Sequence, residues 1–145
     1  MQEIKPGTSR QLTKGDDLAI LSIGHIGKFA KETVGELKKD HIDAAHYDMR
    51  FVKPLDEEQL HKIFKKYHYI ITIEDGSISG GFGSAILEFM CGNNYLSRVK
   101  ILGIPDKFIE HGTQTELWHD CGIDTAGIVS SVKTLLKKPV LSKVI

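Results

Sequence analysis

The chain has 145 residues, and its 19 lysine and arginine residues balance 19 aspartate and glutamate residues. With no net charge, it generates no broad field that would draw it to nucleic acid or anionic lipid. A chain of this length fits one domain with a core large enough to fold unaided. It contains no apolar stretch of about 18 residues and no apolar leader, which predicts a soluble, cytoplasmic protein without a membrane partner.

The first part of the chain predicts a linker followed by a strand and a helix. Residues 1–14 are polar and predict a linker that becomes at most an edge strand near residues 9–13. The apolar run at residues 18–23 predicts a buried strand, and Gly24-His25-Ile26-Gly27 predicts a turn into a helix. This turn is a weak candidate for a ligand loop. His25 could act there as an acid or base, although an ordinary loop histidine is the simpler interpretation.

The next segment contains the best-specified helix start. Ala44–Asp48 predicts a short strand, and Asp56 with Gln59 three residues later predicts an N-terminal cap. Between them, Asp48 and Arg50 flank the end of the strand. They could form a site pair, or an ion pair that pins the loop, and the ion pair is the simpler interpretation.

The centre of the chain combines a strand, a polar loop and a helix. Tyr69–Ile73 is rich in β-branched residues and predicts a strand that Glu74–Ser77 ends. From Gly81 the apolar residues follow helical spacing. The glycines Gly80, Gly81 and Gly83 would let the backbone approach an anionic ligand, or let the helix pack closely on its strand with no ligand. We favour packing.

The last third predicts a strand and two further helices. Val99–Gly103 predicts the strand, Thr113 and Asp124 predict the caps of the helices, and Gly122 lies between these helices. Strands alternating with helices indicate an α/β fold, with a mostly parallel sheet between two helix layers. We place the domain at residues 15–145.

No motif in the chain predicts a catalytic or metal site. The two cysteines, Cys91 and Cys121, lack the spacing of a zinc site and predict free thiols. Asp75-Gly76 followed by Asn93 imitates the motif that binds Mg²⁺ and the diphosphate of thiamine diphosphate. However, the interval is short and a whole helix lies within it, so we expect Asn93 to cap that helix at its far end.

Four stretches of the chain, in this order and at this spacing, carry a specific resemblance. They are Asp48–Asp56, Glu74–Ser77 with Gly80–Ser84, Gly103–Asp106, and Phe108–Gln114. Together they resemble the C-terminal domain of the 1-deoxy-D-xylulose-5-phosphate synthases, which belong to the transketolase superfamily. The resemblance covers roughly residues 16–136. It implies a three-layer α/β/α sandwich whose five-stranded mixed sheet has one antiparallel edge strand, at residues 9–13.

The resemblance also implies a function for a longer protein. Enzymes of this family condense pyruvate with glyceraldehyde 3-phosphate and release CO₂, in a step toward isoprenoid, thiamine and pyridoxal synthesis. They use thiamine diphosphate and Mg²⁺, which upstream domains hold, and they are homodimers. The chain would then be a transferase domain that serves assembly, without catalytic, cofactor or metal residues of its own, and inactive in isolation.

The resemblance makes the loops at the carboxyl ends of the strands candidates for packing on a neighbouring domain or subunit. The candidate residues are Arg50, Glu74, Asp75, Gly80, Gly81, Gly83 and His111. The alternative is a stand-alone α/β module that binds a small phosphorylated ligand at Gly80–Gly83.

Overall fold

The computed structural model describes residues 3–105 and 112–137, which form five strands and five helices. The strands are β1 (Arg10–Thr13), β2 (Leu18–Ser22), β3 (Ala44–Asp48), β4 (Tyr69–Ser77) and β5 (Arg98–Ile104). The helices are α1 (Gly27–Lys39), α2 (Glu57–Lys66), α3 (Phe82–Gly92), α4 (Gln114–Cys121) and α5 (Thr125–Leu136).

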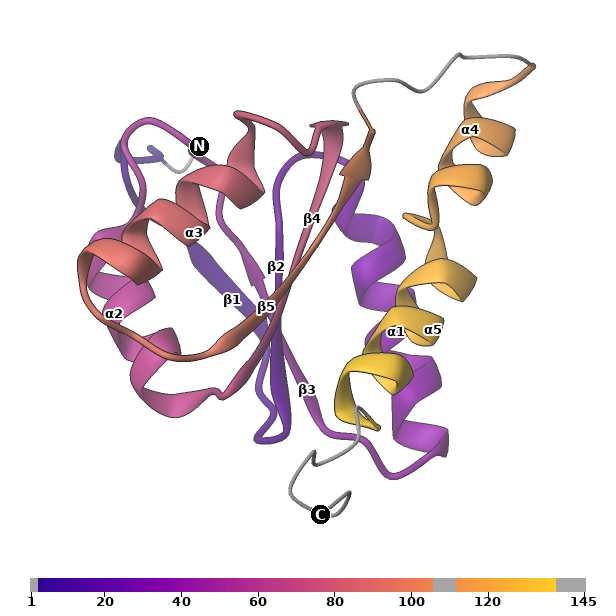
Figure 1. Ribbon diagram of the computed structural model, residues 1–145, viewed down its shortest axis with the longest axis horizontal. Helices are drawn as coiled ribbons and strands as arrows, with labels where there is room; N and C mark the ends of the chain where they lie inside the picture. The colour runs from indigo at the N-terminus through magenta and orange to yellow at the C-terminus, as the bar shows by residue number, and fades with distance from the viewer. Residues whose placement is uncertain (1–2, 106–111, 138–145) are drawn as a thin grey trace, which may run out of the picture.

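The strands form one sheet between two helix layers (Figure 1). The strand order is β1-β3-β2-β4-β5. The β1 strand pairs antiparallel with β3, and the other neighbouring pairs are parallel. Helices α2 and α3 cover one face, while α1, α4 and α5 lie on the other. The predicted sandwich and its antiparallel edge strand are therefore confirmed, whereas the boundary at residues 14 and 15 stays a prediction.

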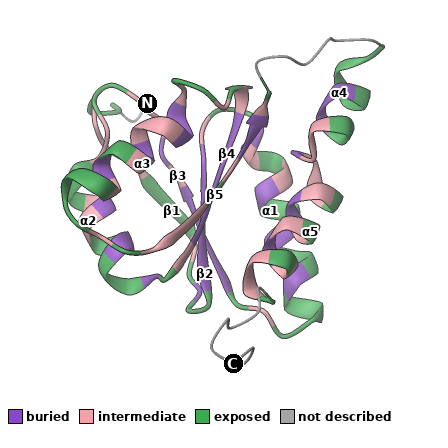
Figure 2. Ribbon diagram, viewed as in Figure 1, coloured by how far each residue is buried: buried purple, intermediate pink, exposed green. Residues whose placement is uncertain are grey.

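The central strands are buried because helices cover both of their faces (Figure 2). Every residue of β2 is buried, and the apolar run of β4 from Ile70 to Ile73 is buried as well. The β4 strand runs to Ser77, so the prediction that it ends at Ile73 was wrong. Its pairing with β5 shifts between Ile73 and Ser77 and then resumes at Ile104. Pairing with β5 thus extends β4 through Glu74–Ser77, whose sequence predicts the end of the strand.

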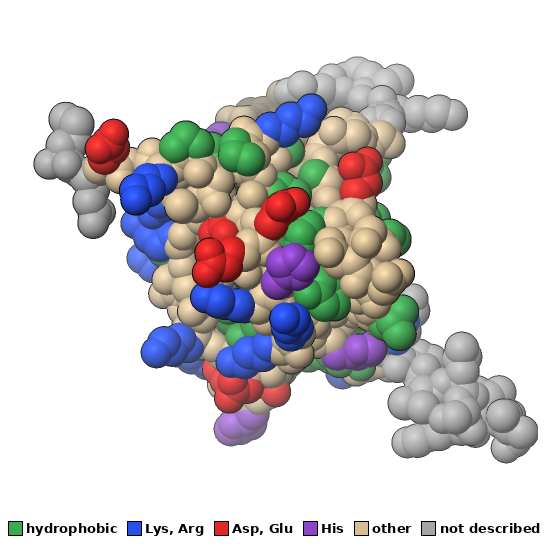
Figure 3. Space-filling model, turned by 90° about the vertical axis from the view of Figure 1, so that its left-hand side faces the viewer, with side chains coloured by type: hydrophobic (Ala, Val, Ile, Leu, Met, Phe, Trp, Pro, Cys, Tyr) green, Lys and Arg blue, Asp and Glu red, His purple; other side chains and the backbone are tan. Residues whose placement is uncertain are grey.

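On the face that Figure 3 presents, which carries α2, most of the lysine and arginine side chains lie toward the left and lower left. Aspartate and glutamate side chains lie beside them. No helix in residues 3–105 and 112–137 has the length and apolar content that crossing a bilayer requires.

The predicted helix caps are confirmed by their hydrogen bonds. The side chains of Asp56, Thr113 and Asp124 accept backbone N–H bonds at 3.1, 3.2 and 3.0 Å, respectively. Asn93 caps the far end of α3, and Gly122 ends α4 with a left-handed φ of 72°. Short-range sequence signals therefore predict where these helices begin or end.

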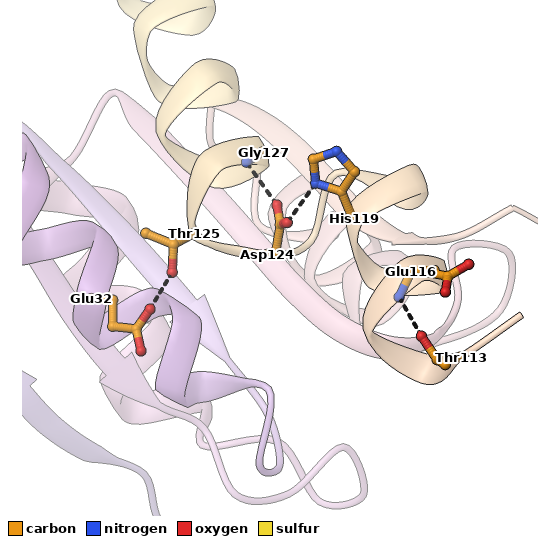
Figure 4. A network of polar contacts seen from close by, with 7 residues as sticks. All are labelled: Glu32, Thr113, Glu116, His119, Asp124, Thr125 and Gly127. Carbon is orange, nitrogen blue, oxygen red and sulfur yellow. Dashed lines mark hydrogen bonds and ion pairs between the residues drawn. The ribbon is translucent and has the colours of Figure 1, made fainter.

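The junction between α4 and α5 is tied together by polar contacts and joined to α1 (Figure 4). His119 Nδ1 lies 2.8 Å from an Asp124 carboxylate oxygen, and this hydrogen bond raises the pKa of His119. Thr125 donates a hydrogen bond of 2.6 Å to Glu32 on α1. These contacts join α4 to α5 and α5 to α1.

The core of the sheet holds one histidine. His46 on β3 is fully buried, and its Nε2 lies 2.7 Å from Ser22 Oγ on β2. Burial lowers the pKa of His46 from 6.5 to about 4, although the carboxylate of Asp48 opposes this shift. The ring is therefore neutral in the folded protein at neutral pH.

Acid should destabilise the protein through His46. Between pH 6.5 and about 4 the unfolded chain binds a proton at this residue that the folded protein does not. Stability therefore falls as the pH drops through this window, by about 3 kcal/mol from this group. Urea titrations at a series of pH values should show a shallower pH dependence in His46→Gln than in the native chain. His68→Gln, at an exposed position, is the control; equal slopes in all three proteins would contradict the assignment.

Candidate functional site

The carboxyl ends of the parallel strands β2, β3, β4 and β5 meet at one edge of the sheet, where ligand and partner sites of α/β folds usually lie. Because Arg10 at the start of β1 pairs with Asp48 at the end of β3, residues 3–9 reach the sheet from this same edge. The edge contains a depression of about 580 Å³ whose lining includes Ile23, Val52 and Phe82. We call this region the carboxyl edge.

Glu74 is the structural centre of the carboxyl edge. Its side chain is 5% exposed, and its two carboxylate oxygens accept the N–H groups of Phe82 at 3.0 Å and Gly83 at 2.8 Å. Gly81, at the N-cap position of α3, supplies no side-chain cap. Glu74 therefore fills, from a neighbouring strand, the position that an anion would take at the start of α3.

Gly81 and Gly83 serve packing, as the sequence interpretation favoured. A Cβ atom at Gly81 would lie 2.1 Å from Glu74 Oε1 and 2.5 Å from the Ser77 carbonyl oxygen. A Cβ atom at Gly83 would lie 2.5 Å from Ile101. Gly80 has open space around it and a φ of 72°, so its requirement is conformational. The loop is tight because it closes on the chain's own side chains.

Asp75 links β4 to α4. Its carboxylate accepts hydrogen bonds from Trp118 Nε1 at 3.1 Å and Gln114 Nε2 at 3.4 Å, and it lies 3.8 Å from His25 Nε2. Trp118 is 5% exposed. A charge change at Asp75 would therefore disturb the packing of α4 within this chain, as well as any contact with a neighbour.

Arg50 occupies the loop after β3 in a left-handed conformation, with a φ of 61°. Its backbone N–H donates to the carboxylate of Asp48 at 3.2 Å, while Arg10 is the cation near that carboxylate, at 3.7 Å. The predicted side-chain ion pair between Asp48 and Arg50 is therefore wrong, because the edge strand brings Arg10 to this place. Among the described residues, nothing forms a hydrogen bond or ion pair with the Arg50 guanidinium. His111 lies outside the described residues.

The described residues do not fit a thiamine diphosphate site. Asp75 lies at the carboxyl edge, whereas Asn93 caps α3 at the opposite end of that helix. In residues 3–105 and 112–137 no group of three or more histidine, cysteine or acidic side chains could hold a metal ion. The expectation that Asn93 has a capping role is confirmed.

Sequence reasoning missed two polar arrangements at this edge. One is the cap that Glu74 provides, for which the lack of a capping side chain at Gly81 was the available signal. The other is the Ser22–His46 pair, which joins two strands that are separated in sequence by α1. No local pattern pointed to that pair.

Solved structures with a similar fold include transketolases. A split-gene transketolase, described as an inactive beta4 tetramer, superimposes with a TM-score of 0.86 at 29% identity over 94% of this chain and 44% of that chain. The transketolase of Campylobacter jejuni superimposes with a TM-score of 0.65 at 17% identity, over 92% of this chain and 19% of that one. The fold is thus that of a domain found within transketolases.

Sequence comparison identifies the domain. The profile of the transketolase C-terminal domain matches residues 7–128, so the chain belongs to the transketolase C-terminal domain family. It is 54% identical over 134 residues to a 1-deoxy-D-xylulose-5-phosphate synthase of Cytophaga hutchinsonii, covering 92% of this chain and 21% of the relative. The corresponding protein of Bacteroides fragilis is 51% identical over 88% of this chain and 20% of its own length. The chain spans about a fifth of the length of these relatives.

Proposed function

We propose that this chain is the C-terminal domain of a 1-deoxy-D-xylulose-5-phosphate synthase, a cytoplasmic transferase that condenses pyruvate with glyceraldehyde 3-phosphate and releases CO₂. The observation that carries this proposal is the 54% identity to the Cytophaga hutchinsonii protein over 92% of the chain. Thiamine diphosphate and Mg²⁺ would be held by the other domains of that enzyme, because the residues described here do not fit them.

The role of the domain in this proposal is assembly. Its partners are the upstream domains of the same polypeptide, and a second subunit in a homodimer. The position of residues 3–9 at the carboxyl edge supports this role, because an upstream segment would reach the domain beside the candidate loops. The internal use of Glu74 also weighs against the alternative of a phosphorylated ligand at Gly80–Gly83.

The activity is tested in a polypeptide that joins this chain to its upstream sequence. We expect that polypeptide to produce 1-deoxy-D-xylulose 5-phosphate when it is supplied with pyruvate, glyceraldehyde 3-phosphate, thiamine diphosphate and Mg²⁺. The isolated chain should produce none. A longer polypeptide that folds and binds the cofactor without making this product would refute the proposed reaction.

Arg50 is the sharpest probe of the assembly role. Its backbone is held by Asp48, and its guanidinium is not engaged within the described residues, so it can pair with a carboxylate of a neighbouring domain. Arg50→Glu in the longer polypeptide should weaken the association between domains or subunits by about tenfold, because a pair becomes a repulsion. Analytical ultracentrifugation and limited proteolysis would measure this.

The matched control for Arg50 is Lys38→Glu. Lys38 lies in the last turn of α1, away from the carboxyl edge, and is exposed. Its charge reversal should leave both assembly and activity unchanged. Equal assembly in the Arg50 and Lys38 variants would show that Arg50 does not lie in the interface.

A further inference from the structure

The segment that leads into the sheet, residues 3–9, contains a bend that its own sequence favours. Lys5-Pro6-Gly7-Thr8 has the order of proline and glycine that is typical of a type II turn, in which the glycine takes a positive φ. Gly7 has a φ of 73°, and the Thr8 hydroxyl donates a hydrogen bond of 2.6 Å to the Lys5 carbonyl oxygen. We call residues 3–9 the entry segment.

Asp56 holds the entry segment at the point where it reaches the sheet. One oxygen of its carboxylate, Oδ2, accepts both the backbone N–H and the hydroxyl of Ser9, each at 2.7 Å. Hydrogen bonds to an ionised acceptor are stronger than those between neutral groups. Ser9 directly precedes β1, so the two bonds fix the last residue of the entry segment.

The second oxygen of Asp56 has a separate role. Oδ1 accepts the Gln59 N–H at 3.1 Å and so caps α2. An N-cap needs one acceptor oxygen, which a serine side chain supplies equally well. Burial raises the pKa of Asp56, but hydrogen bonds from Ser9 and Gln59 outweigh burial and hold the pKa below its usual value. The ionised carboxylate thus joins the start of α2 to the entry segment.

The entry segment also packs against the loop that carries Arg50. A Cβ atom at Gly7 would lie 3.1 Å from Pro54 Cγ and 3.7 Å from the Leu55 carbonyl oxygen. The entry segment therefore runs along the loop between β3 and α2, at the carboxyl edge. The same loop thus contacts the entry segment and presents the guanidinium that is proposed to meet a neighbouring domain.

We infer that Asp56 is a positioning residue, whose bonds to Ser9 fix the direction of the entry segment and thereby hold an upstream domain over the carboxyl edge. This inference rests on the proposed function, because it requires a domain that precedes the entry segment. A fixed linker restricts the orientations of the domain that it tethers, which raises the effective concentration of the contact at Arg50. With a free linker, the interface alone would have to set the orientation, and interfaces between domains commonly permit relative motion.

Amide hydrogen exchange of the 145-residue chain, followed by NMR, tests the contact between Asp56 and Ser9. Asp56→Ser keeps an acceptor for the Gln59 N–H and removes the oxygen that Ser9 binds. Exchange of the Ser9 amide should become about tenfold faster, because a hydrogen bond to a charged group is lost, and exchange of the Gln59 amide should change less than about twofold. Equal exchange of the Ser9 amide in the native and Asp56→Ser chains would overturn the inference.

Asp124→Ser is the matched control, because Asp124 caps α5 in the same way on the other face of the sheet. Its Oδ1 accepts the Gly127 N–H, and its Oδ2 lies 2.8 Å from His119 Nδ1. The control therefore also removes the second contact of a capping aspartate, and its Ser9 amide should exchange at the native rate. Equally fast exchange of this amide in both variants would show a general destabilisation and refute the specific role of Asp56.

The positioning role itself is tested in a polypeptide that joins this chain to its upstream sequence. Proteinase K should cleave within the entry segment about tenfold faster in Asp56→Ser than in Asp124→Ser, and small-angle X-ray scattering should show a larger radius of gyration. Ser9→Ala should give an intermediate cleavage rate, whereas Ser9→Thr, which keeps the hydroxyl, should restore the native rate. Equal cleavage and scattering in the Asp56 and Asp124 variants would refute the positioning role.

Failure of this inference can be distinguished from failure of the proposed function. A native longer polypeptide that makes no 1-deoxy-D-xylulose 5-phosphate would refute the proposed reaction, whereas cleavage and scattering of the variants report on the linkage between domains. A polypeptide that makes the product, but in which Asp56→Ser and Asp124→Ser give the same cleavage and scattering, would refute the role of Asp56 alone.

Discussion

Replacing Glu74 with alanine is expected to lower the free energy of unfolding by about 3 kcal/mol, because two buried N–H groups lose their acceptors and a cavity forms. The affected donors are the backbone N–H groups of Phe82 and Gly83. Glu74→Gln keeps one carbonyl acceptor, so its cost should be about half as large. Urea denaturation with linear extrapolation measures both values.

The control for Glu74 is Glu88→Ala. Glu88 is an exposed residue of α3, so its removal should change stability by less than about 0.5 kcal/mol. Glu74→Ala should also increase amide hydrogen exchange in the first turn of α3 relative to the rest of that helix. A stability for Glu74→Ala equal to that of Glu88→Ala would mean that Glu74 does not hold the start of α3.

Gly81→Ala should be comparably severe, with a loss of about 3 kcal/mol in the free energy of unfolding. The new methyl group would lie 2.1 Å from Glu74 Oε1 and 2.5 Å from the Ser77 carbonyl oxygen, and the second atom belongs to the backbone. Relief requires either the loop or the Glu74 carboxylate to move. Gly81→Ala therefore tests the packing of Glu74 against the start of α3 by changing the residue that lies against the Glu74 carboxylate.

Two other glycines provide matched controls for Gly81. Gly35 lies inside α1 with nothing near its missing Cβ, so Gly35→Ala should raise the free energy of unfolding by about 0.7 kcal/mol. Gly80 has open space but a φ of 72°, so Gly80→Ala should cost about 1 kcal/mol. If Gly81→Ala matched Gly35→Ala in thermal and urea unfolding, the tight packing of this loop would be refuted.

These stability effects bear on how the domain could work. The loop that most resembled a ligand cradle is closed by Glu74, and Asp75 holds α4 through Trp118. The Glu74 and Asp75 carboxylates at the carboxyl edge are therefore engaged by contacts within this chain. Arg50, in contrast, is held there through its backbone N–H, and its guanidinium has no hydrogen-bond or ion-pair partner among the described residues.

The sequence and the structure agree where a signal is local. Capping residues such as Asp56, Thr113 and Asp124 act on N–H groups three residues away, so the sequence alone places them. Helical spacing of apolar residues likewise predicts α1, α3 and α5, an apolar run predicts β2, and a run rich in β-branched residues predicts β4. The extent of β4 was underestimated because the partner strand β5 supplies its last pairing, at Ser77.

What the sequence by itself determined is the α/β architecture, the family resemblance and the helix ends, because each depends on neighbours along the chain or on ordered motifs. Only the tertiary structure decided the roles of the polar residues. Asp75 and Trp118 are 43 positions apart, and Ser22 and His46 are 24 apart. Strand order and helix packing determine which donor binds which carboxylate. A residue that resembles a ligand-binding group in the sequence can therefore cap a helix or hold two elements together.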